Sequence, residues 1–368
     1  MAGTHSGVGK TSVATGLAAA LVGAGHRVAT AKVGPDFIDP GYHAMATGRP
    51  GRNLDAWMSG AGAVPALAHQ AAGDADVLVV EGVMGLFDGA SSGVPGGLDP
   101  NRDDASTAHI ARLLDAPVVL VVDAAAMSRS VAAMLGGFMG FDADVRVAGV
   151  ILNRVGGDGH ELLLREAIEP LGVPVVGALH RDDAFAWRDR HLGLVPVVEQ
   201  RSEVTASVDR LAAAVAECCD LEAIVRLART APTTVPGVAL RPARRVAGPG
   251  AEPFAGGEQA TGSGGPLRVA VAGGPAFSFS YPDNLERLAE TGAEVVPFDP
   301  LNDPALPGDL AGLVVGGGFP EVFGAALADN GPLLADVARQ VGAGLPTWAE
   351  CGGLLWLARS LDGHAMAG

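Results

Sequence analysis

Cysteine and positive charge are both scarce in this chain of 368 residues. Its three cysteines, of which Cys218 and Cys219 are adjacent, give no framework of disulfides and are typical of a protein of the reducing cytoplasm. The 25 lysines and arginines are outnumbered by 41 aspartates and glutamates, which leaves a net charge of −16. Nucleic acids and anionic membranes bind proteins through basic faces, so neither is expected as a partner.

Long hydrophobic runs are also missing, although 48% of the residues are hydrophobic. A membrane-spanning helix needs about 20 consecutive apolar residues, and no run reaches that length. The alanine-rich stretch 13–22 has no basic leader before it, so we interpret it as the first helix of the fold and not as the core of a signal peptide. The length and the hydrophobic content predict a soluble enzyme of two domains.

A glycine-rich motif, THSGVGKT at residues 4–11, opens the chain. In such a motif backbone N–H groups surround phosphates, the lysine supplies a positive charge, and the final hydroxyl reaches Mg²⁺. We therefore predict that a nucleotide is bound by Thr4, Gly7, Gly9, Lys10 and Thr11. A motif of this kind normally follows a buried strand. Met1 and Ala2 are too few to form one, so we expect the sequence to begin inside the first domain.

Short valine-rich runs alternate with helical patterns up to about residue 176. The predicted strands are 28–33, 77–80, 118–122, 147–152 and 173–176, and the predicted helices lie near 62–72, 104–115, 128–139 and 160–170. Continuous apolar strands separated by helices predict a parallel sheet covered on both faces. Such sheets bind ligands at the carboxyl ends of their strands.

The chain is predicted to divide into two domains. The first, residues 1–229, closes with a helical segment that starts at Thr205. Residues 230–266 are rich in proline, glycine and alanine without periodicity, which predicts a linker. A second α/β pattern fills residues 267–368, with strands predicted at 267–272, 294–298, 313–315 and 345–348.

Charged side chains follow two strands of the predicted first domain. Lys32 lies near the end of strand 28–33, and Asp36 and Asp39 follow that strand, where a carboxylate can hold Mg²⁺ and a lysine can neutralise a transferring phosphoryl group. Glu81 ends strand 77–80, a position that contacts the metal in phosphate-loop enzymes, and Asp88 adds a second carboxylate. The alternatives are aspartates that cap turns and a solvated acidic turn.

Two further residues bear on the class of nucleotide-binding protein. Asn153 follows strand 147–152, where its amide can read the adenine edge or satisfy backbone groups at the strand end. His5 stands where partitioning-type ATPases carry a lysine that acts across a dimer, so a motor or regulatory ATPase is disfavoured.

The second domain places Cys351 at a strand-to-helix turn. Gly352 and Gly353 permit a tight backbone there, and the helix N-terminus favours the reactive thiolate, as in a nucleophile elbow. The earlier glycine run 316–318 offers N–H groups for an oxyanion hole. A buried cysteine beside glycines is the alternative. We do not expect His364 to be the base that such a cysteine needs, so we expect the chain to end within the fold and not to hydrolyse glutamine.

Together these motifs resemble those of the cobyrinic acid and hydrogenobyrinic acid a,c-diamide synthases of cobalamin biosynthesis. The similar segments are residues 3–11, 32–36, 52–55, 81–89 and 349–353. The first domain is also similar to dethiobiotin synthetase, and the second resembles a class I glutamine amidotransferase domain. The resemblance implies an α/β fold: a P-loop NTPase-type parallel-sheet domain followed by a class I glutaminase-like domain, truncated at both chain ends.

The resemblance also implies a reaction, in which ATP converts the a and c carboxylates of a corrin ring to acyl phosphates that ammonia from glutamine then displaces. By this resemblance Lys10, Thr11 and Glu81 serve ATP–Mg²⁺. Asp36, Asp39 and Asp88 serve the metal, the corrin carboxylates or the intermediate, and Lys32 balances their charge. Cys351 forms a glutamyl thioester. Asp36 is included with Thr11 and Glu81 as a metal ligand. Arg49, Arg52 and His43 are able to meet the polyanionic substrate, although exposed surface charges explain them equally well.

The partners implied are therefore a corrin polycarboxylate, ATP, and glutamine or ammonia, with Mg²⁺ as cofactor. Two other functions stay open: amidation of another tetrapyrrole acid such as nickel-sirohydrochlorin, and a partitioning or regulatory ATPase. The expected location is the cytoplasm, and a homodimer is one assembly open to the protein.

Overall fold

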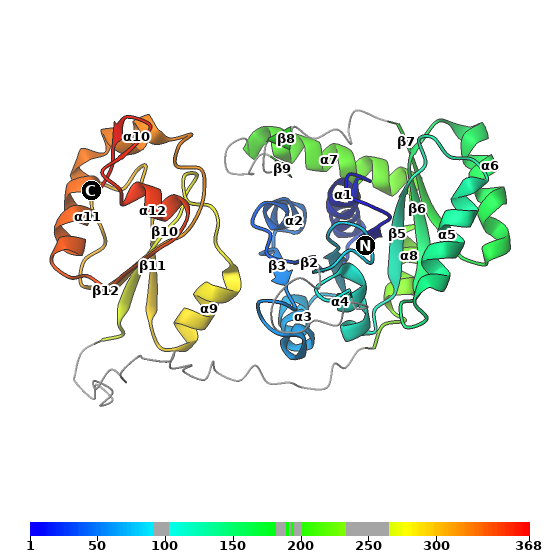
Figure 1. Ribbon diagram of the computed structural model, residues 1–368, viewed down its shortest axis with the longest axis horizontal. Coiled ribbons are helices and arrows are strands. Elements are labelled where there is room, and N and C mark those ends of the chain that lie inside the picture. The colour runs from blue at the N-terminus through cyan, green and yellow to red at the C-terminus, as the bar shows by residue number, and fades with distance from the viewer. Residues whose placement is uncertain (91–102, 182–188, 191–192, 195–200, 233–264) are drawn as a thin grey trace. The chain divides into compact units, whose positions relative to one another are not determined.

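The computed structural model describes residues 1–90, 103–181, 189–190, 193–194, 201–232 and 265–368 (Figure 1). It divides into two compact units, Met1–Leu240 and Arg241–Gly368, and each is described by itself. Most of the predicted linker, residues 233–264, lies outside the described residues. Among the helices that are described, none is long and apolar enough to cross a membrane.

The amino-terminal unit is built on parallel strands. They are β1 (Ala2–Gly3), β2 (Val28–Val33), β3 (Arg52–Leu54), β4 (Val77–Glu81), β5 (Val118–Asp123), β6 (Val147–Val155) and β7 (Val175–His180). Two ladders form, in the orders β3-β2-β4 and β1-β5-β6-β7, and each pair in them is parallel. The predicted parallel sheet is therefore confirmed, and β2 has the predicted bounds.

Met1 joins the two ladders. Its amino group donates a hydrogen bond to the carbonyl oxygen of Val80 (2.7 Å), and the N–H of Gly82 donates to the carbonyl oxygen of Met1 (2.8 Å). The short strand β1 pairs on its other side with β5. The prediction that the first residues are too few to form a strand is wrong, because strong neighbours on both sides hold even two residues in the ladder.

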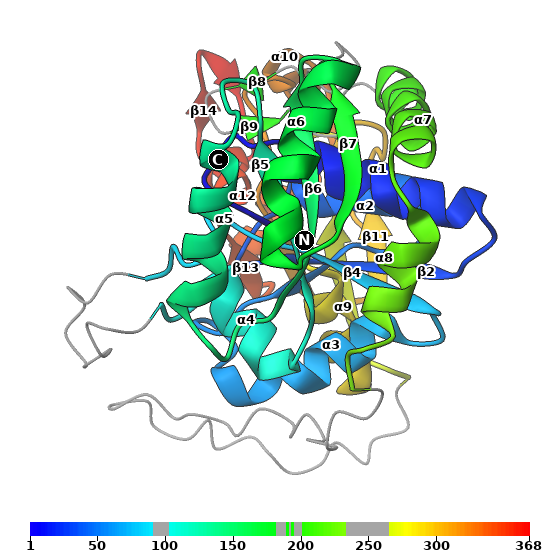
Figure 2. The ribbon, with the colours of Figure 1, turned by 90° about the vertical axis from the view of Figure 1, so that its right-hand side faces the viewer.

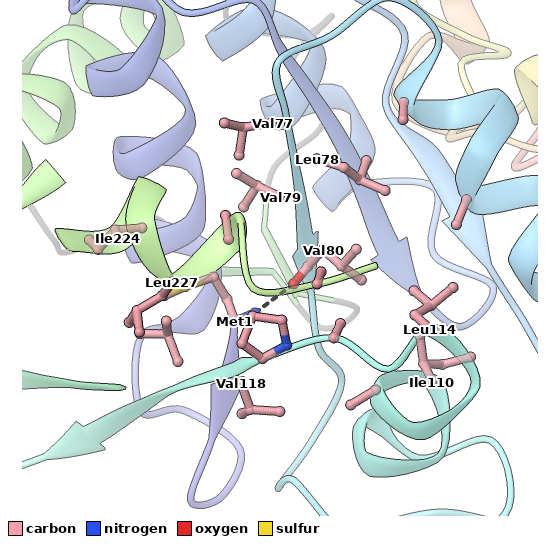
Figure 3. Close-up of a pocket in the computed structure, with 18 of the residues that line it drawn as sticks. Met1, Val77, Leu78, Val79, Val80, Ile110, Leu114, Val118, Ile224 and Leu227 are labelled. Atoms are coloured by element: carbon pink, nitrogen blue, oxygen red, sulfur yellow. Dashed lines mark hydrogen bonds between the residues drawn. The ribbon is translucent and has the colours of Figure 1, made fainter. Parts of the chain in front are cut away.

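An apolar cavity of about 360 Å³ lies beside Met1, between β4 and β5 (Figure 3). Its lining includes residues 77–80 of β4, Val118 of β5 and Leu227. The amino group of Met1 is buried there, and this burial lowers its pKa to about 6, although the charge of Glu81 opposes the shift.

Helices cover both faces of the sheet. One face carries α1 (Lys10–Gly23), α2 (Asp39–Thr47), α7 (Arg201–Cys218) and α8 (Leu221–Ala228), and the other carries α3 (Val64–Ala72), α4 (Thr107–Leu114), α5 (Ser130–Phe141) and α6 (Asp158–Ile168). Strand β5 shows the division: Val119 and Val121 join the core under α1, while Leu120 and Val122 join the core under α5. Figure 2 shows α5 and α6 on one side of β5–β7 and α7 and α8 on the other.

Two helical regions differ from the predicted ones. Helix α2, which begins at Asp39, was not predicted. The closing helical segment is two helices, because Asp220 accepts a hydrogen bond from the N–H of Ala223 and starts α8 as its cap (2.8 Å). Short elements fill the connections: η1 (Ala61–Ala63), η2 (Glu169–Leu171) and the hairpin of β8 (Asp189–Arg190) and β9 (Gly193–Leu194).

The carboxyl-terminal unit has a second parallel sheet. Its strands β10 (Arg268–Ala272), β11 (Glu294–Phe298), β12 (Leu310–Val315) and β13 (Thr347–Ala349) lie in the order β11-β10-β12-β13. The helices are α9 (Pro282–Glu290), α10 (Gly324–Asp329), α11 (Gly331–Gly342) and α12 (Gly352–Trp356), and β14 (Ser360–Leu361) pairs with β15 (His364–Ala365). Buried Trp356 packs against Phe277 and Phe298 at the centre.

Candidate active site

The conformation of the phosphate loop in the amino-terminal unit is fixed by its glycines and by side-chain hydrogen bonds from Asn153 and Arg154. Gly7 and Gly9 have φ of 80° and 95°, a region that disfavours other residues. The amide nitrogen of Asn153 donates to the carbonyl oxygen of Val8 (2.8 Å), and a Cβ on Gly9 would lie 2.4 Å from that nitrogen. Arg154 donates to the carbonyl oxygen of Gly7 (3.0 Å). The loop is therefore a preformed concave backbone ahead of α1, as phosphate binding requires.

The side chain of Asn153 thus forms hydrogen bonds with backbone groups in this structure. Its side chain is buried, and its oxygen accepts the N–H of Arg154 (2.9 Å) while its nitrogen supports the phosphate loop. Of the two roles that the sequence left open, these contacts support the backbone role.

Thr11 and Lys10 begin α1 at the foot of this loop. The hydroxyl of Thr11 donates to Oε1 of Glu81 (2.6 Å) and lies 3.3 Å from Oδ2 of Asp39. Nζ of Lys10 donates to the carbonyl oxygen of His5 (3.3 Å). Burial, followed by the charge of Lys32, lowers the pKa of Lys10.

Glu81 is the centre of a buried charged cluster. Its Oε1 accepts from Lys32 (2.7 Å) as well as from Thr11, and its Oε2 lies 2.7 Å from Nε2 of His43. Burial alone would raise the pKa of Glu81, but Lys32 and His43 outweigh it and hold the pKa below its usual range. Glu81 is therefore ionised although no part of it is exposed.

Lys32 neutralises two carboxylates of the cluster. Its Nζ lies 2.6 Å from Asp39 and 2.7 Å from Glu81, and it also donates to the carbonyl oxygen of Gly82 (3.2 Å). Burial would lower the pKa of Lys32, but the two carboxylates raise it above the ordinary value. For Asp39, burial and the nearby Glu81 raise the pKa to about 6.

The oxygens of Thr11, Asp39 and Glu81 fit a magnesium ion. A hydroxyl and two carboxylates converge at the phosphate loop, and hard oxygen ligands are the ones Mg²⁺ takes. Asp36, which the sequence also suggested as a ligand, is placed differently. Its Oδ1 accepts the N–H groups of Ile38 (2.7 Å) and Asp39 (3.0 Å), so it caps the turn into α2.

Asp88 lies on the loop that follows β4 and faces the phosphate loop. Its Oδ2 accepts the N–H of Gly85 (2.8 Å), and a Cβ on Gly85 would lie 3.0 Å from the carbonyl oxygen of Thr4. Its charge also acts on Lys10, whose pKa it raises against the effect of burial. The structure therefore brings Asp88 to the same site as Lys10, Thr11 and Glu81.

Sequence reasoning misread His43 and missed Asn53, whereas Arg49 fits the surface-charge alternative. His43 is buried on Glu81 and does not lie on an exposed surface. The four-residue spacing from Asp39 to His43 places both on one side of α2, and that spacing was the available signal. Asn53 donates to the carbonyl oxygens of Gly34 and Asp36 (both 2.8 Å) and so shapes the loop before α2. Arg49 pairs at the surface with Asp74 (2.7 Å).

The carboxyl-terminal unit holds Cys351 in a strained turn between β13 and α12. Its φ is 49°, which is unusual for a residue with a side chain, and it is exposed. A Cβ on Gly353 would lie 2.2 Å from the carbonyl oxygen of Val315, so only glycine fits there. A Cβ on Gly317 would lie 3.5 Å from Cβ of Cys351, so the predicted oxyanion loop lies beside Cys351. These features match the predicted nucleophile elbow.

Comparison with known proteins assigns a family to each of the two units. Residues 1–195 match the family described as CobQ/CobB/MinD/ParA nucleotide binding domain, and residues 268–366 match the CobB/CobQ-like glutamine amidotransferase domain. Hydrogenobyrinate a,c-diamide synthase of Streptomyces coelicolor is 50% identical over 388 residues, which cover 100% of this chain and 77% of that protein. The enzyme of the same name from Thermobifida fusca is 49% identical over 99% of this chain and 74% of its own length.

Cobyrinate a,c-diamide synthase of Syntrophotalea carbinolica is also similar, with 43% identity over 100% of this chain and 76% of that protein. The relatives thus share both units of this chain, and the residues of the phosphate loop and the cysteine elbow lie inside the matched regions. The chain therefore belongs to the family of hydrogenobyrinate and cobyrinate a,c-diamide synthases.

Proposed function

We propose that this enzyme amidates the a and c side-chain carboxylates of cobyrinic or hydrogenobyrinic acid, with ATP–Mg²⁺ as activator and glutamine or ammonia as nitrogen source. The observation that carries the proposal is the buried cluster of Thr11, Lys32, Asp39 and Glu81 directly behind a preformed phosphate loop. The names of the relatives supply the substrate class.

The reaction has two steps for each carboxylate. In the first, a carboxylate oxygen bonds to the γ-phosphorus of ATP and the bond from that phosphorus to the bridging oxygen breaks, which releases ADP. In the second, the nitrogen of ammonia bonds to the carbonyl carbon, the bond to the phosphate oxygen breaks, and a proton leaves the nitrogen. Phosphorylation is needed because a bare carboxylate has no adequate leaving group.

The residues of the cluster have separate tasks in this proposal. Thr11, Asp39 and Glu81 would hold Mg²⁺, which neutralises phosphate charge when it is bound. Lys10 is proposed to contact the phosphates, and Lys32, whose Nζ lies 2.6 Å from Asp39 and 2.7 Å from Glu81, is proposed to balance the charge of the site. Asp36 and Asp88 remain proposed to act on the metal, the corrin carboxylates or the intermediate.

The carboxyl-terminal unit would supply the ammonia. Cys351 is proposed to attack glutamine and form a glutamyl thioester, with the neighbouring glycine loop binding the oxyanion. The exposure of Cys351 and its strained turn support this role.

A cytoplasmic location is supported by three cysteines that form no disulfide. A homodimer is proposed on the exposed side chains of Trp57 and Met58, which follow the edge strand β3.

Mass spectrometry tests the proposal. Hydrogenobyrinic acid is incubated with the chain, ATP and Mg²⁺, once with ammonium and once with glutamine. Two successive conversions of carboxylate to amide with ammonium are expected, and they must vanish when ATP is omitted. No product from either corrin acid, despite measurable ATP binding, would overturn the substrate assignment. Product with ammonium alone would confine the failure to the glutamine half.

A further inference from the structure

His43 lies in the interior on α2, one helical turn after Asp39. Its side chain is 1% exposed, and Nε2 is 2.7 Å from Oε2 of Glu81. Because an ionised carboxylate only accepts hydrogen bonds, Nε2 carries the hydrogen and donates it. Nδ1 finds no hydrogen-bond partner within the part of the chain that the structure describes. The hydrogen bond to Glu81 is therefore the polar contact that stabilises the buried imidazole of His43.

The two oxygens of Glu81 are divided between two groups of partners. Oε1 accepts from Thr11 and Lys32, on the side where the phosphate loop lies. Oε2 accepts from His43. A carboxylate turns about the bond that joins it to its side chain, and a partner on each oxygen removes that freedom. Hydrogen bonds to the second oxygen of a metal-binding carboxylate orient the first oxygen in this way.

We propose that His43 is a positioning residue of the Mg²⁺–ATP site, which holds Oε2 of Glu81 so that Oε1 faces Thr11. The inference rests on the proposed function, because it assumes that Glu81 and Thr11 hold the metal. Helix α2 makes a second contact with the same site through Asp39, whose Oδ2 lies 3.3 Å from the hydroxyl of Thr11. The helix thus fixes both carboxylates of the site, one directly and one through the imidazole.

Two substitutions separate this role from a merely structural one. His43→Leu keeps an apolar side chain of moderate size but removes the donor. His43→Gln keeps an N–H donor about where Nε2 lies. His160→Gln is the matched control. Nδ1 of His160 accepts the N–H of Gly156, Nε2 donates to the carbonyl oxygen of Met127, and neither nitrogen contacts the cluster.

The measurements are the Mg²⁺ concentration that gives half the maximal rate of amidation with ammonium, and the binding of Mg²⁺–ATP by calorimetry. His43→Leu is expected to raise both the half-saturating Mg²⁺ concentration and the dissociation constant by about 10- to 100-fold. In His43→Leu, KM for the corrin acid is expected to stay unchanged. His43→Gln is expected to recover most of the lost Mg²⁺ and Mg²⁺–ATP affinity, and His160→Gln is expected to behave as the parent chain does.

Other outcomes overturn the proposal. A folded His43→Leu chain with parental Mg²⁺ dependence would show that the imidazole orients nothing. Restoration of the melting temperature by His43→Gln without restoration of Mg²⁺ dependence would show a purely structural role. A raised KM for the corrin acid alone would make His43 a substrate contact. If the parent amidates neither corrin acid, the proposed function fails, and calorimetry still decides the inference about His43.

Discussion

The two proposed sites of this chain, around Glu81 and around Cys351, are stabilised by different interactions. Around Glu81, charged groups are buried and hold one another through hydrogen bonds of 2.6–2.7 Å. Around Cys351, the side chain is exposed, and close backbone contacts that only glycine permits set the geometry. The first centre depends on electrostatic balance, so removing one member leaves others unpaired. The second depends on steric fit, so adding a single carbon is enough to disturb it.

The largest effect is expected when the alkylation rates of exposed Cys351 and buried Cys219 are compared. Burial raises the pKa of Cys219 to about 12, which lowers its thiolate fraction about 10³-fold relative to an ordinary thiol. Cys351 is exposed and is expected to react with iodoacetamide at pH 8 about 10³-fold faster than Cys219. Peptide mass spectrometry over time measures both rates. Equal rates in the folded chain would contradict the assigned burial.

Glu81→Gln breaks the electrostatic centre. The substitution keeps the size of the side chain but removes the charge that Lys32 and the proposed metal need. Amidation with ammonium is expected to fall more than about 100-fold, because even indirect partners of a metal cost 10- to 100-fold. Rate measurements at saturating Mg²⁺ check this, with His160→Gln as control. A loss below about tenfold would remove Glu81 from the metal site.

Gly353→Ala disturbs the steric centre. The added Cβ would lie 2.2 Å from the carbonyl oxygen of Val315, so the turn at Cys351 must move. Overpacking of this kind costs about 1–3 kcal/mol, and the effect should be confined to the carboxyl-terminal unit. Thermal unfolding and the alkylation rate of Cys351 report the change. Gly342→Ala is the control, because a Cβ there meets nothing within 4 Å.

Prediction from sequence succeeded where the signal is local. The valine-rich runs gave β2 and β11 with their observed bounds, because β-branched residues favour strands both in the buried β2 and in the edge strand β11. It failed for β1, whose two residues carry no pattern of their own and are strands only because β4 and β5 flank them. It also left Asn153 undecided, since its partner Val8 is 145 residues away in the chain.

The sequence by itself determined the phosphate loop and the cysteine turn, because each is a contiguous run whose glycines set the backbone locally. The tertiary structure alone decided how the charges combine. The parallel register of β2 and β4 sets Lys32 beside Glu81, and the packing of α2 brings Asp39 and His43 to the same carboxylate. The contacts of Glu81 with Thr11, Lys32 and His43 join residues 38 to 70 positions apart, so pairing and packing fix them and no local pattern encodes them.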